Sequence, residues 1–119
     1  AALSPAERWL IAIRTASHTG SGAAVDWYSA QADTSKVKEG LIVKARNAAE
    51  PWNGDPRSNA IMRHVDLIVT HPVDSSQSDI DALADGGLSP MAIVALSQVV
   101  AYVSYQVRLV ATLRALGAS

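Results

Sequence analysis

The last quarter of the chain, residues 88–116, is the apolar stretch that most constrains the fold. Ser89 can cap a helix and Pro90 suits its first turn, because that turn has N–H groups without intrahelical partners. Gly117 offers a stop. The pattern predicts one helix of roughly 40 Å, which is longer than a domain of this size is wide. One apolar face contains Ile93, Leu96, Val100, Val103, Val107, Val110 and Leu113.

The opposite side of this predicted helix is apolar as well. It carries Met91, Ala95, Val99, Tyr102 and Leu109. An all-round apolar pattern is typical of a helix that is buried on most of its circumference. We therefore expect other helices to wrap it, or a second subunit to cover its far end.

The same stretch is long enough to span a membrane, and between Met91 and Leu113 its only charge is Arg108. A spanning helix would leave four polar side chains in lipid, and the rest of the chain offers no second span to bond them. We therefore expect no membrane span. The four polar residues are Ser97, Gln98, Ser104 and Gln106.

The remaining segments carry helix signals and no strand signals. Residues 4–7, SPAE, form a capping box that starts a first helix, and the TGSG run at 19–22 ends it. Further helices are predicted at about residues 23–32, 35–49, 56–71 and 76–85, the second of these capped by Thr34 or Ser35. The β-branched runs lack flanking hairpin turns. We expect one all-α domain over residues 1–119, a bundle of about six helices around the long C-terminal one.

The chain has no cysteine, which excludes disulfides, thiolate metal sites and thiol catalysis. A net charge of −1 gives no overall field to attract nucleic acid or anionic lipid, so neither is an expected partner. The start shows no basic region followed by an apolar run, which favours a cytoplasmic protein. A basic cluster at Lys36, Lys38, Lys44 and Arg46 is interpreted as a solvated face, with a basic docking patch as the alternative.

The histidines give no metal-ligand pattern. His64 and His71 are seven residues apart, about 10 Å along a helix, which is too far to share one metal. Asp66 and Asp74 lie near them, but no HExxH spacing exists, so no metal site is predicted. His71 is interpreted as a helix-end cap. In the final helix Ser97, Ala101, Ser104 and Arg108 form a small and polar stripe, either a close helix contact or the wall of a polar pocket.

Two parts of the sequence carry a family resemblance. They are IMRHVDLIVTHP with SDIDALADGGLSPMAIVALSQVVAYVSYQVRLVATLRALG at 61–117, and LSPAERWLIAIRTASHTG at 3–20. The chain resembles the carboxymuconolactone decarboxylase-like domain proteins of the alkylhydroperoxidase D-like superfamily. The resemblance implies an all-α bundle that assembles into dimers, trimers or hexamers through long helices. Within the superfamily, the resemblance places the chain beside a subgroup of small domain proteins that accompany, or are fused to, a peroxidase-related domain.

The thiol-active relatives reduce peroxides with two cysteines three apart, a histidine on the same helix and a glutamate on the helix before. In this sequence the cysteine positions fall at Ser21 and Ala24, and the histidine position falls at Tyr28. Glu7 is the nearest carboxylate to the relay position, but its register is off, so that role is not transferred. Serine has no accessible anion near neutral pH without an activating base, so we expect no thiol peroxidase activity.

Two functions stay open at this point. The first is a non-catalytic or partner-dependent member of this superfamily, which assembles through its long helices and completes a site on a peroxidase-related subunit. The second is a cofactor-free lactone decarboxylase or isomerase, because such relatives need no cysteines. It would use His18, Asp26 or Tyr28 as acid or base. No cofactor is expected for either function.

Overall fold

The computed structural model describes residues 2–70 and 77–117. These residues form six helices and no strand, which confirms the predicted all-α class. The helices are α1 (Pro5–His18), α2 (Gly22–Thr34), α3 (Glu39–Arg46), α4 (Pro56–Thr70), α5 (Gln77–Asp85) and α6 (Pro90–Ala115). His71 and Asp74, which the sequence analysis considered, lie outside the described residues.

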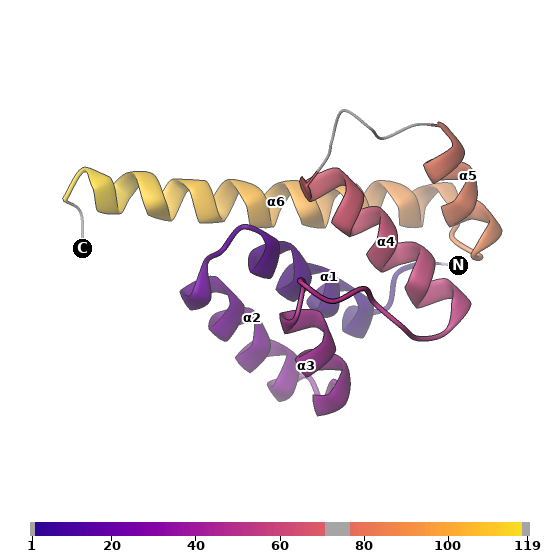
Figure 1. Ribbon diagram of the computed structural model, residues 1–119, viewed down its shortest axis with the longest axis horizontal. Coiled ribbons are helices and arrows are strands. Elements are labelled where there is room, and N and C mark those ends of the chain that lie inside the picture. The colour runs from indigo at the N-terminus through magenta and orange to yellow at the C-terminus, as the bar shows by residue number, and fades with distance from the viewer. Residues whose placement is uncertain (1, 71–76, 118–119) are drawn as a thin grey trace.

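The helix at the centre of the bundle is α1, which packs against α2, α3, α4 and α6 (Figure 1). Every residue of α1 from Leu10 to Ala16 is buried. The expectation that the C-terminal helix occupies the centre is therefore wrong. α4 also packs mainly on α1, and its contact with α6 is smaller. The spacing of apolar residues shows that a helix has an apolar face. It does not show which other helices of the chain pack against that face.

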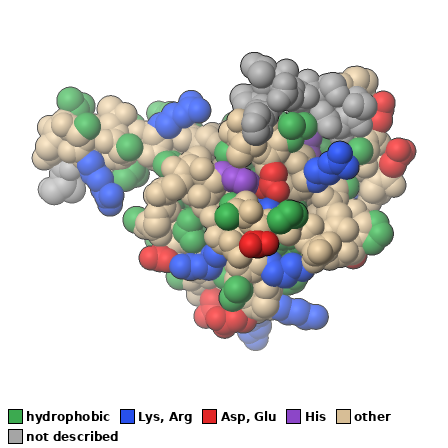
Figure 2. Space-filling view, viewed as in Figure 1, with side chains coloured by type: hydrophobic (Ala, Val, Ile, Leu, Met, Phe, Trp, Pro, Cys, Tyr) green, Lys and Arg blue, Asp and Glu red, His purple; other side chains and the backbone are tan. Residues whose placement is uncertain are grey.

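The long helix α6 is confirmed, and it is buried on one side only. Ser89 caps it by accepting a hydrogen bond from the N–H of Ala92 at 3.2 Å, and Gly117 follows it with a φ of 83°. Its buried residues are Ala92, Leu96, Val100 and Val103. Beyond them α6 projects past the rest of the bundle (Figure 1), and its exposed surface there carries apolar side chains (Figure 2).

Three helices end in the same left-handed turn. After α1, the N–H of Ser21 donates to the carbonyl of Ala16, and Gly20 has a φ of 77°. After α2, the N–H of Val37 donates to the carbonyl of Ala32, with Lys36 at a φ of 63°. The turn after α5 has Gly87 at a φ of 96°. This is the Schellman arrangement, which satisfies carbonyl groups at a helix C-terminus.

The second turn corrects a predicted boundary. Ser35 was expected to begin the third helix, but α2 continues to Thr34 and Ser35 is its C-cap. The left-handed conformation of Lys36 is uncommon for a residue with a side chain. It directs Val37 into the core, where this residue is buried. α3 consequently begins at Glu39 and ends at Arg46, shorter than the predicted segment.

Candidate functional site

The positions of the degenerate thiol motif lie together at the start of α2. Ser21 is the N-cap of α2, and its hydroxyl accepts a hydrogen bond from the N–H of Ala24 at 3.2 Å. Ser21, Ala24 and Tyr28 line one groove of about 300 Å³ between α2 and the projecting half of α6. These three residues therefore lie on one face of α2. Because they present a hydroxyl, a methyl and a phenol group, the groove contains no nucleophile of the thiol type.

Tyr28 joins α2 to α6 by hydrogen bonds. Its hydroxyl donates to Oε1 of Gln106, and Nε2 of Gln106 donates to the hydroxyl of Tyr102 at 3.0 Å. Burial raises the pKa of Tyr28, and the neighbouring Tyr102 raises it further. The phenol therefore stays protonated at neutral pH, which suits a hydrogen-bond donor and not a general base.

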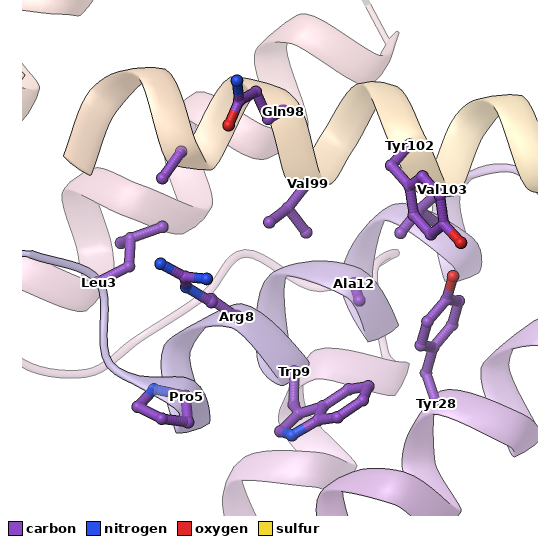
Figure 3. A pocket seen from close by; sticks show the side chains of 11 residues that line it. Leu3, Pro5, Arg8, Trp9, Ala12, Tyr28, Gln98, Val99, Tyr102 and Val103 are labelled. Carbon is purple, nitrogen blue, oxygen red and sulfur yellow. The ribbon is translucent and has the colours of Figure 1, made fainter. Parts of the chain in front are cut away.

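A larger groove of about 690 Å³ lies on the other side of Tyr28, between α1, α2 and α6 (Figure 3). Its walls are mostly apolar and include Trp9, Ala12, Val99 and Val103. Figure 3 shows the Tyr28 hydroxyl pointing toward Tyr102, and the Arg8 side chain lying between α1 and α6. This groove could not be predicted from the sequence. It is formed by residues from segments that are distant in the sequence, and none of them belongs to a recognisable motif.

His18 lies in a partly buried ionic cluster. Its Nε2 is 2.5 Å from Oδ1 of Asp66. The same carboxylate accepts hydrogen bonds from Nε of Arg14 at 2.6 Å and from an η nitrogen at 2.8 Å. Arg14 is 1% exposed and also donates to the carbonyls of Lys44 and Glu50. The cluster therefore fixes α1, the α3 to α4 connection and α4 to one another.

Sequence reasoning missed this cluster. The signal that could have found it is a charged residue inside each of two apolar helical stripes, Arg14 in the first helix and Asp66 in the fourth. A buried arginine is tolerated only with a carboxylate or carbonyl partner. Burial raises the pKa of Asp66, but hydrogen bonds from Arg14 and His18 outweigh burial and hold the pKa below its usual value.

The cluster predicts an acid-sensitive contribution to stability. Since the folded-state pKa of Asp66 is lowered, the unfolded chain binds the proton more readily. The contribution is complete above the ordinary carboxyl pKa of about 3.9 and is lost as the pH falls through the folded-state pKa. We expect Asp66→Asn to remove about 2 kcal/mol of stability at pH 7, because Arg14 then loses its carboxylate. Urea unfolding from pH 2 to pH 7 measures both effects.

The stability of the wild type at acid pH also depends on Glu7 and Asp55, because the pKa values of these two carboxyl groups are lowered as well. The comparison that isolates Asp66 is therefore the difference between the wild type and Asp66→Asn at each pH. This difference is expected to shrink toward acid pH. A difference that stays constant from pH 7 to pH 2 would show that the charge of Asp66 does not stabilise the fold.

The three candidate acid or base residues have separate partners. His18 contacts Asp66, whereas Tyr28 contacts Gln106. The Asp26 side chain is 71% exposed and accepts a hydrogen bond from Arg46 at 2.9 Å. Tyr28 lines two of the grooves described above. The structure therefore does not bring His18, Asp26 and Tyr28 into one acid and base site.

The basic cluster is partly engaged within the chain. Nζ of Lys44 donates to the carbonyl of Asn53 and lies 4.7 Å from the centroid of the Trp52 ring. Arg46 donates to Asp26 and to the hydroxyl of Ser29. A basic docking patch therefore has only the exposed Lys36 and Lys38 left to form it.

The small and polar stripe of α6 lines a third groove, of about 550 Å³, together with Ile68 of α4. Ser97, Ala101, Ser104 and Arg108 all belong to it. Within residues 2–70 and 77–117, no group of three or more His, Cys, Asp or Glu side chains is placed to hold a metal ion.

Comparisons with protein-family models, with curated proteins and with solved structures give no match to this chain.

Proposed function

We propose that this chain is a cysteine-less member of the carboxymuconolactone decarboxylase-like group, within the alkylhydroperoxidase D-like superfamily. Its proposed task is assembly, either with further copies of itself or with a peroxidase-related subunit, in the cytoplasm. The observation that carries the proposal is the C-terminal half of α6, which leaves the bundle with apolar side chains on its surface. The six-helix architecture and the resemblance of residues 3–20 and 61–117 to the family support it.

The projecting half of α6 needs a partner for physical reasons. The last buried residue of α6 is Val103, although the helix continues to Ala115. The segment still contacts α2 through Gln106 and packs against the core at Val107, whereas its end projects past the bundle (Figure 1). A helical end without tertiary contacts has marginal stability in water. Apolar patches of this kind on a soluble protein mark interaction sites. The exposed apolar residues beyond Val103 are Tyr105, Leu109, Val110, Leu113 and Leu116.

A second copy of the same helix suits this surface. The stripe of Ser97, Ala101 and Ser104 carries small side chains, which let another helix approach closely. Tyr105 and Leu109 lie beside the stripe in the same groove and can form the apolar core of a contact. A self-complementary contact of this kind generates a two-fold dimer, from which a hexamer can be built.

A membrane is the competing partner for the same helix. α6 is the one helix in the described chain that is long and apolar enough to span a membrane, and 17% of its most apolar window is buried. The polar residues Ser97, Gln98 and Arg108 favour a protein surface over lipid. Flotation with phosphatidylcholine vesicles separates the two possibilities, because an assembly domain stays at the bottom of the gradient.

The lactone decarboxylase or isomerase function has less support. Its candidate residues lie in three different contacts, and the residue that does line a groove, Tyr28, is held as a protonated hydrogen-bond donor. Acid catalysis at Tyr28 is the form of this alternative that the geometry favours. Loss of lactone turnover in a Tyr28→Phe variant, if the wild type shows any turnover, would establish it.

The thiol part of the proposal is tested by restoring the missing residues. The wild type is expected to show no peroxide turnover with a dithiol donor above a heat-killed control, because it has no cysteine. In the double variant Ser21→Cys and Ala24→Cys, the two thiols lie at the N-terminal turn of α2, where the helix dipole lowers a cysteine pKa. We expect an intrachain disulfide and measurable peroxide consumption.

The matched control is Ser21→Cys alone, which has a thiol at the same place but no second cysteine in the chain. It is expected to form no intrachain disulfide under mild oxidation, and its oxidised thiol can be reduced only by the added dithiol, since the chain supplies no resolving partner. If the double variant forms no disulfide under mild oxidation, the proposed equivalence between these positions and the family motif is wrong.

A further inference from the structure

The groove between α1, α2 and α6 has the size and composition of a small-molecule site. Its volume of about 690 Å³ lies inside the range of roughly 300 to 1,000 Å³ that such sites occupy. Its lining is predominantly apolar, with Trp9, Val99 and Val103 among the walls. Its polar lining residues are Arg8 on α1, Gln98 on α6, and Tyr28 and Tyr102 with their hydroxyl groups (Figure 3).

Arg8 gives the groove a positive charge that the protein does not neutralise. The side chain is exposed and has no hydrogen-bond or ion-pair partner within the described chain. The adjacent carboxylate, Glu7, accepts hydrogen bonds from Arg57 at 2.8 and 3.2 Å, and from the N–H of Ser4. Glu7 is therefore committed to the contact between α1 and α4 and is not available to Arg8.

The position of Arg8 in α1 strengthens the preference for an anion. The residue lies at the end of the first turn of α1, which begins at Pro5. The macrodipole puts partial positive charge at this end of a helix, so a cationic side chain there adds to it instead of offsetting it. An anion in the groove beside Arg8 interacts favourably with both the guanidinium group and the helix terminus.

The far end of the groove offers a neutral donor. The Tyr28 proton is used in the hydrogen bond to Gln106, and Tyr102 accepts a hydrogen bond from the same amide. None of the described hydrogen bonds uses the hydroxyl proton of Tyr102, so that proton can be donated to a bound molecule. A second negative charge has no partner at this end, because the groove contains one cationic residue.

We propose that this groove binds an apolar monocarboxylate, with the carboxylate at Arg8 and the apolar body along Trp9, Ala12 and Val99 toward the tyrosines. This goes beyond the proposed assembly role. The charge of Arg8 selects a carboxylate over a neutral lipid, and the apolar walls select a hydrocarbon or aryl body over a sugar or a nucleotide.

Isothermal titration calorimetry with decanoate, below its micelle concentration, tests the proposal on the full chain. Decanol has the same body without the charge, and decylamine has the opposite charge. The wild type is expected to bind decanoate about tenfold more tightly than decanol, the contribution of one charge-assisted hydrogen bond. Arg8→Gln is expected to remove this preference, and Arg8→Glu to transfer it to decylamine.

Arg63→Gln is the matched control, because Arg63 is an exposed arginine on α4 that does not line the groove. It is expected to keep the decanoate preference of the wild type. The proposal is overturned if decanoate does not bind, if it binds no more tightly than decanol, or if Arg8→Gln binds it as the wild type does. Loss of binding together with a change of solution mass in Arg8→Gln would assign the groove to a second copy of the chain instead.

Discussion

Val103→Asp is expected to abolish folding. Val103 is 1% exposed on α6, at the contact with the central helix α1. An ionised carboxylate there has no cationic partner. The free-energy cost of burying an unpaired charge is larger than the destabilisation caused by an ordinary point mutation. We expect a loss of more than about 4 kcal/mol, which is a large part of the stability of a domain of this size. Circular dichroism during thermal unfolding measures it.

The matched control is Val94→Asp, which places the same carboxylate on α6 at a side chain that is 50% exposed. This variant is expected to unfold within a few degrees of the wild type, since a solvated charge on a helix surface changes stability by about 0.5 kcal/mol or less. A folded Val103→Asp protein with the wild-type melting temperature would contradict the placement of Val103 in the core.

Val110→Asp is expected to dissociate the assembly without unfolding the chain. Val110 lies on the projecting half of α6, with 46% of its surface exposed in the isolated chain. A charge at this position is solvated in the free chain and desolvated in an interface between helices, so it acts on association. We expect the dissociation constant to rise about 100-fold or more, which corresponds to about 3 kcal/mol. Sedimentation velocity at several concentrations measures the shift.

Val43→Asp provides the comparison, because Val43 is a similarly exposed valine on α3, far from α6 in the sequence. It is expected to sediment as the wild type does. If Val43→Asp dissociates the assembly and Val110→Asp leaves it intact, the interface lies on the α3 face and not on α6.

The helix boundaries set by capping residues could be predicted from the sequence. The capping box at Ser4 and Glu7 forms, with hydrogen bonds of 2.8 and 3.1 Å, and Ser89 caps α6. These signals are readable because a cap depends on residues only three positions apart. The burial of Val103 could also be predicted, since its place in the apolar stripe is a property of one helix.

The features that depend on distant segments could not be predicted. The central position of α1 depends on which helices surround it. Because α6 has the longer apolar pattern in the sequence, α6 and not α1 was expected at the centre. The cluster of Arg14, Asp66 and His18 joins residues 48 to 52 positions apart. Lys36 adopts a left-handed conformation that glycine usually provides, so the true end of α2 carried no recognisable signal.

In the candidate site, too, the features set by one helix could be predicted, whereas those set by the packing of distant helices could not. Ser21, Ala24 and Tyr28 are three and four positions apart on a single helix, a spacing that places them on one face. Their groove with Gln106, and the larger groove beside Arg8, depend on how α6 crosses α1 and α2. The pairing of His18 with Asp66 likewise required the packing of α4 on α1, so the sequence alone could not separate His18 from the other acid and base candidates.

The solution mass of the wild-type chain tests the central claim, assembly through α6, most directly. Sedimentation equilibrium without detergent, over a range of micromolar concentrations, gives this mass independently of molecular shape. The account predicts two or more times the chain mass of 12.5 kDa. A mass of 12.5 kDa at every concentration would contradict self-assembly and leave a peroxidase-related subunit as the remaining proposed partner of the projecting half of α6.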